Sequence, residues 1–165
     1  MLLFNRRNAL FLALGAGISA CGFEPVYKQG TTASNIQDQI EIELVKGRNG
    51  FELREELENK LGRAVSTAPY FLTLKLSTSE TGIAVTKSEG STRTSLSGIV
   101  EFTVRRKDSR RAIYRDSVQN LTAYGTTSAT YSSAVASRDA NTRLMKALAA
   151  QIAQRIAITS DGWAK

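Results

Sequence analysis

Apolar and polar residues alternate along the middle of this chain, and that period of two constrains the fold more than any other feature. Successive side chains of a strand point to opposite faces of a sheet, so the alternation predicts strands with one buried face. The signal is clearest over residues 96–104, where every second residue is apolar or glycine. The pattern predicts four strands, over residues 36–45, 70–77, 96–106 and 111–124.

The connections between these strands are polar and short. Residues 107–110, with the sequence KDSR, are expected to form a hairpin turn between the last two strands. Residues 78–82 are expected to hold another turn. Residues 83–94 suit either a further strand or an exposed loop.

Two segments have helical rather than strand periodicity. Leucines recur every four residues over 50–61, and Asn49 and Glu52 have the spacing of a capping box. A second helix is expected over 131–158, with an apolar stripe of Ala140, Leu144, Leu148, Ile152 and Ile156. The order strand, helix, strands, helix predicts an α+β fold. We expect a mostly antiparallel or mixed sheet of four to five strands, with both helices packed on one face.

The composition excludes most catalytic chemistry. The 165 residues contain no histidine and one cysteine, so catalytic triads, histidine-ligated metals and intrachain disulfides are excluded. A serine–lysine dyad or a carboxylate pair remains compatible with the composition, but no arrangement of residues indicates one. We therefore predict no catalytic residues, no metal and no cofactor.

The N-terminus has the three parts of a bacterial export signal. Arg6 and Arg7 precede an apolar run, and the run ends in small residues before Cys21. The sequence ISAC resembles a lipobox, in which the cysteine thiol receives a diacylglycerol and the signal is cut just before the cysteine; the alternative is a buried N-terminal helix. We predict a signal peptide over 1–20, a lipidated flexible tether over 21–35, and a single domain over 36–160. Acyl chains on Cys21 would attach the chain to a membrane.

The charge balance is basic, with 22 Lys and Arg against 15 Asp and Glu. Basic surfaces favour anionic partners, and export makes nucleic acid an unexpected one, which leaves lipid, lipopolysaccharide and cell-wall polymer. Seven bases fall between Arg93 and Arg115, opposed by two acids. They form either a solvated hairpin tip with a charged edge strand, or a patch for phosphate or an acidic partner. Lys87 and Arg93 lie in the polar segment 86–95, which is either a plain connection or a ligand-binding loop.

Two stretches resemble a known family. CGFEPVY, from Cys21 to Tyr27, is similar to the start of the LptE family of lipopolysaccharide-assembly lipoproteins in alphaproteobacteria. YSSAVASRDANTRLMKALAAQIAQRI, residues 131–156, resembles the terminal helix of that family. The expected order of strands and helices matches as well.

The resemblance implies a function without catalysis. Members of that family lie at the periplasmic face of the outer membrane, plug and help assemble the β-barrel LptD, and help deliver lipopolysaccharide to the cell surface. By this resemblance the residues expected to contact lipopolysaccharide are Lys87, Arg93 and Arg138, the last near the start of the final helix. Two alternatives remain: an envelope lipoprotein adaptor, or a lipoprotein enzyme acting on a cell-envelope substrate.

Overall fold

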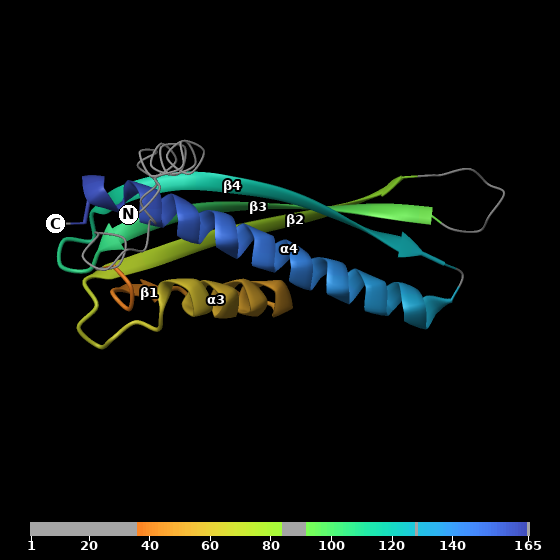
Figure 1. Ribbon diagram of the computed structural model, residues 1–165, viewed down its shortest axis with the longest axis horizontal. Helices are drawn as coiled ribbons and strands as arrows, with labels where there is room; N and C mark the ends of the chain where they lie inside the picture. Colours follow the sequence, from red (N-terminus) through yellow and green to blue (C-terminus); the bar gives the residue numbers. More distant parts are fainter. Residues whose placement is uncertain (1–35, 84–91, 128, 165) are drawn as a thin grey trace, which may run out of the picture.

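One mixed sheet with two helices on a single face makes up the described part of the chain (Figure 1). The computed structural model describes residues 36–83, 92–127 and 129–164. The predictions for the signal peptide, the tether, Cys21 and Lys87 therefore lie outside the described residues. The elements are β1 (Ile40–Ile42), α3 (Arg48–Leu61), β2 (Tyr70–Ile83), β3 (Thr92–Arg106), β4 (Ala112–Thr126), α4 (Thr130–Thr159) and the short 3-10 helix η1 (Ser160–Gly162).

The sheet has the order β1-β2-β3-β4. The short β1 runs parallel to β2, while β2, β3 and β4 pair antiparallel. Leu72 lies opposite Val104, and Val100 lies opposite Val118, so the apolar residues of neighbouring strands share one face. The predicted α+β class, with a mixed sheet and two helices on one face, is confirmed.

The turn predicted over 78–82 is wrong, because β2 continues in register with β3 as far as Ile83. Thr78 and Glu80 occupy the same side of β2 as the buried Leu72, but both are exposed. This part of the strand lies beyond the core, so backbone pairing persists while the apolar alternation ends. The predicted first strand is also too long, since Asp38 turns the chain with φ 60° and donates its N–H to the Leu61 carbonyl (2.9 Å).

The predicted capping box does not form. α3 begins at Arg48 after Gly47, which has φ 86°, and no side chain caps it. Asn49 instead donates from Nδ2 to Oδ1 of Asn141 on α4 (2.8 Å). Glu52 accepts from the Thr142 hydroxyl (2.9 Å) as well as from Arg48. Both predicted capping residues are thus used to hold the two helices together.

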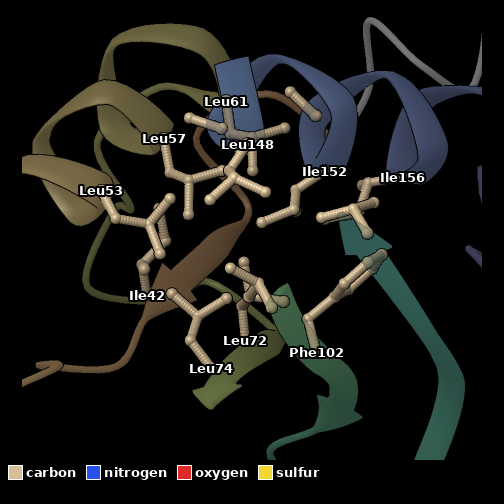
Figure 2. Packing of buried hydrophobic residues seen from close by; sticks show 14 of the residues in the cluster. Ile42, Leu53, Leu57, Leu61, Leu72, Leu74, Phe102, Leu148, Ile152 and Ile156 are labelled. Atoms are coloured by element: carbon tan, nitrogen blue, oxygen red, sulfur yellow. The ribbon is translucent and has the colours of Figure 1, made fainter. Parts of the chain in front are cut away.

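The predicted apolar stripe of α4 is buried along its whole length. Figure 2 shows Leu148, Ile152 and Ile156 of α4 packed beside α3 and over the sheet. The side chains that meet them come from α3, β1, β2 and β3: Leu53, Leu57, Leu61, Ile42, Leu72, Leu74 and Phe102. Burying each large apolar side chain contributes about 1.5–3 kcal/mol, so this cluster holds the layers together.

Gly98 sets how closely α4 approaches β3. A Cβ at this position would lie 2.9 Å from Leu148 Cδ1 and 3.0 Å from Leu144 Cδ2. The helix therefore packs directly on the backbone of the central strand. Any branched side chain at residue 98 would push α4 away from the sheet.

We predict that Gly98→Val lowers the free energy of unfolding by about 1–3 kcal/mol, the usual cost of overpacking a core. Chemical denaturation followed by circular dichroism measures the change. The matched control is Gly82→Val at the far end of β2, where nothing lies within 4 Å of the added Cβ. Equal losses from the two variants would contradict the role assigned to Gly98.

Three aromatic rings and the partly buried carboxylate of Asp116 pack at the C-terminal end of α4. Trp163 lies edge-on to Tyr70 and stacks with Tyr114, with ring centroids 5.4 and 6.4 Å apart. The Tyr114 hydroxyl donates to Asp116 (2.8 Å), and this bond, with the Ser117 N–H, lowers the pKa of Asp116. Burial, and then the bond to Asp116, raises the pKa of Tyr114.

The lowered pKa of the Asp116 carboxyl makes the free energy of unfolding depend on pH at the acidic end of the scale. Because the pKa of Asp116 is lower in the folded chain than in the unfolded chain, its contribution is complete above about 3.9, the ordinary value. It is lost as the pH falls toward the folded pKa. We predict that the stability difference between the native protein and Asp116→Asn shrinks as the pH falls through this range. A difference that is constant with pH, measured by urea denaturation, would contradict the assignment.

Candidate functional site

The two helices cover only part of the sheet, because α3 is much shorter than α4. α3 has 14 residues and α4 has 30. Three contacts join the two helices: Asn49 to Asn141, Glu52 to Thr142, and Glu56 to Lys146 (3.6 Å). Because these contacts advance along both helices in the same order, α3 and α4 run parallel. The residues of α4 that precede these contacts run past the beginning of α3, as Figure 1 shows.

That part of α4 exposes apolar side chains beside a cation. Tyr131 is 83% exposed and Val135 is 45% exposed. Residues three and four apart on a helix are neighbours, so Tyr131, Val135 and Arg138 share one face, which continues into Thr142 at the contact with α3. We call Tyr131, Val135 and Arg138 the distal surface. The Arg138 side chain is exposed, and no ion pair joins it to another described residue.

The other predicted base in the structure, Arg93, lies on a different surface. Arg93 of β3 is exposed, and it alternates with Thr94, Leu96 and Gly98, whose side of the strand meets the helices. Its side chain position is therefore on the opposite face of the sheet from α4. Arg93 and Arg138 lie in different layers, and the structure does not bring these two predicted residues together.

The helix-free face of the sheet is largely polar. Its central positions along β2, β3 and β4 hold mainly Ser, Thr and Gln, with Lys75 and Glu101 paired across two strands (3.4 Å), and Arg93, Arg105 and Arg115 lie toward its two ends. Two exposed apolar residues stand among them: Ile99, at 42%, and Leu121, at 65%. None of the described helices packs on this face.

The run of bases from Arg93 to Arg115 divides between the two ends of β3. Residues 105–115, which we call the basic hairpin, surround the turn between β3 and β4. Arg93 lies twelve residues earlier, a distance of about 40 Å along a strand. The predicted turn at 107–110 is confirmed, but the single basic patch considered from the sequence is not formed.

Two surface grooves accompany these features. One of about 560 Å³ lies between β1 and α3, and its lining includes Glu58, which pairs with both Arg54 and Arg63. The other, of about 510 Å³, lies between β4 and the end of α4 and is lined mainly by polar side chains. Within the described ranges there is no group of three acidic or cysteine side chains placed to hold a metal. None of the described helices combines the length and apolar character needed to span a membrane.

Comparison with known proteins identifies the family of this chain. The family model described as LptE, lipopolysaccharide-assembly, matches residues 37–157, which include every strand and most of the terminal helix. The chain belongs to the LptE family. The family is one of non-enzymatic lipopolysaccharide-assembly lipoproteins, so the prediction that this LptE-family chain is no enzyme is confirmed. No curated protein matches its sequence.

Solved structures of low sequence identity share the fold. A Caulobacter crescentus protein described as a lipoprotein is 21% identical with a TM-score of 0.67, over 79% of this chain and 96% of its own. A minor lipoprotein of Acinetobacter baumannii is 15% identical with a TM-score of 0.58, over 73% and 89%. Rare lipoprotein B of Shewanella oneidensis is 16% identical with a TM-score of 0.51, over 77% and 98%.

Sequence reasoning missed two parts of the site. Tyr131 and Val135 were not singled out, because the apolar spacing of α4 does not reveal where α3 stops covering it. Ile99 and Leu121 fall on the polar side of their strands, and this departure from the alternation was the available signal. Arg138 was expected near the helix start, and it lies at the ninth residue of α4.

Proposed function

We propose that this lipopolysaccharide-assembly lipoprotein is anchored through Cys21 at the periplasmic face of the outer membrane. There it plugs and helps assemble an LptD-like β-barrel and takes part in lipopolysaccharide transport to the cell surface. The observation that carries this proposal is the family match, which covers 121 of the 165 residues (37–157).

The helix-free face of the sheet supports a barrel partner. In the central part of this face the side chains are mostly small and polar and Lys75 is paired with Glu101, while Arg93 and Arg115 lie toward its two ends. The lumen of an outer-membrane barrel is also polar. A polar face with two exposed apolar residues, Ile99 and Leu121, suits contact with such a wall.

The distal surface supports contact with lipopolysaccharide. Lipid A combines phosphate groups with acyl chains, and a ligand of this kind needs a cation beside apolar side chains. Arg138 supplies a planar guanidinium that donates two hydrogen bonds to a phosphate. Tyr131 and Val135 supply exposed apolar area one and two turns away. Arg93 of β3, together with Lys87 six residues earlier in the sequence, is proposed as a further contact.

Affinity purification tests the barrel partnership. The tagged full-length chain is extracted from outer membranes in mild detergent, and the eluate is identified by mass spectrometry. We expect a stoichiometric partner of the size of a large β-barrel. The variant Leu121→Glu changes the helix-free face and should lower the recovery of the barrel. The control variant Arg63→Glu changes an exposed residue beyond α3 and should not lower it. A lone lipoprotein or an inner-membrane partner would contradict the proposal and favour an adaptor role.

We predict that Arg138→Glu, alone and with Lys87→Glu, weakens lipopolysaccharide binding at least about fivefold, because a charge-assisted hydrogen bond is lost and repulsion replaces it. Binding is measured with purified protein and labelled lipopolysaccharide. Because Arg138 is exposed, the free energy of unfolding should change by less than about 0.5 kcal/mol.

Arg63→Glu is the control, since Arg63 is 88% exposed and lies just beyond the C-terminal end of α3. It removes the same charge away from the distal surface. Equal binding by Arg138→Glu and the native protein would remove Arg138 from the site. Equal weakening by both variants would assign the effect to net charge.

A further inference from the structure

The positive charge of the exported chain is concentrated in one hairpin. From Cys21 onward the chain carries 20 Lys and Arg against 15 Asp and Glu, a net charge of +5. The basic hairpin, residues 105–115, contains six bases and one acid, which is also +5. The remaining residues therefore balance at 14 bases and 14 acids. The excess charge is a property of this hairpin and not of the domain as a whole.

Much of this charge faces solvent. Arg110, Arg111 and Arg115 are exposed, and none of the three has an ion pair with another described residue. Lys107 pairs with Glu41, and the Asp108 carboxylate accepts from the N–H of Ser109 within the turn.

The turn itself is well defined. Arg110 has φ 52°, and its carbonyl accepts from the Arg105 guanidinium (3.3 Å). The Arg106 guanidinium stacks over the ring of Tyr70, with 5.9 Å to the centroid. Arg105 and Arg106 thus hold the base of the hairpin, and the exposed arginines project from a fixed turn.

The basic hairpin lies at the end of the domain where the described chain begins. The N–H of Lys107 donates to the Pro69 carbonyl (2.8 Å), and the next residue, Tyr70, donates its N–H to Gln39 (3.2 Å). Figure 1 shows the turn between β3 and β4 at the same end as β1, opposite the far ends of β2 and β3. Fourteen residues separate Cys21 from Ile36, and a flexible chain of that length spans about 20 Å on average.

We propose that the basic hairpin docks on the anionic phospholipid headgroups of the leaflet that carries the lipid anchor. The inference rests on acylation of Cys21, which belongs to the proposed function. A tether of this length keeps the hairpin near the bilayer, where each Lys or Arg strengthens binding about fivefold. The contact would orient the domain, with the hairpin at the membrane and the distal surface directed away from it.

The test measures binding of the unacylated domain to vesicles. The chain from residue 21 onward with Cys21→Ser retains the whole described core, which runs from Ile36 to Ala157, so it is expected to fold. Cosedimentation is compared between vesicles that contain phosphatidylglycerol and vesicles of phosphatidylcholine alone. We expect binding to the anionic vesicles only, and weaker binding at high salt because the charges are exposed.

Two variants with the same change of charge locate the contact. Arg110→Glu with Arg111→Glu should lower the vesicle partition coefficient at least about tenfold. Arg48→Glu with Arg143→Glu, whose exposed side chains lie on the helices outside both the basic hairpin and the distal surface, should leave it near the native value. Circular dichroism confirms that both variants are folded.

Several outcomes would overturn the inference. Equal binding to neutral vesicles would exclude headgroup recognition, and equal losses in the two variants would assign binding to net charge. Absence of vesicle binding, with loss of a co-purified protein in the hairpin variant, would assign the hairpin to an acidic protein partner. The proposed function fails separately, through absence of acyl label on Cys21, of barrel co-purification or of lipopolysaccharide binding, because the vesicle assay uses unacylated protein.

Discussion

The packing of α4 along the sheet creates the apolar surface against which the other elements are buried. Leu144 and Leu148 lie directly over Gly98, and Ile152 and Ile156 continue the contact toward the C-terminus. α3 then packs against both α4 and the sheet through its three buried leucines. The apolar residues of β1 and α3 belong to the same cluster as those of α4, so all three elements are buried together.

The lengths of the two helices divide the molecule into two ends of different chemistry. Where α3 and α4 lie side by side, they shield one face of the sheet from solvent, and Trp163 packs against Tyr70 and Tyr114 at the end of this cluster. Beyond the start of α3, the face of α4 that would contact α3 is exposed as the distal surface. The basic hairpin lies at the end of the sheet that both helices cover. The distal surface with Arg138 and the basic hairpin therefore lie at different ends of the domain, and we propose different ligands for them.

Periodicity predicted an element well where one face of that element is buried along its length. The α4 stripe and the alternation of β3 both reflect one buried face, and both predictions are confirmed. The predictions are wrong where a residue's burial does not match its backbone structure, or where its partner lies far away in the sequence. β2 remains paired through Ile83 although its outer residues are exposed. Asn49 and Glu52 have capping-box spacing, but α4 offers them partners from a segment about ninety residues away, which local spacing cannot reveal.

The class of fold, the absence of histidine chemistry and the family resemblance could all be predicted from the amino-acid sequence, because they depend on composition, periodicity and local motifs. Which charges lie close together depends instead on how the elements pack. Bases that are close in sequence, from Arg93 to Arg115, separate to the two ends of β3, since an extended strand carries its residues apart by about 3.4 Å each. Arg93 and Arg138 fall on opposite faces because strand alternation and helix packing assign them to different layers. Which part of α4 stays uncovered depends on where α3 begins, and that position is set by contacts between segments distant in the chain.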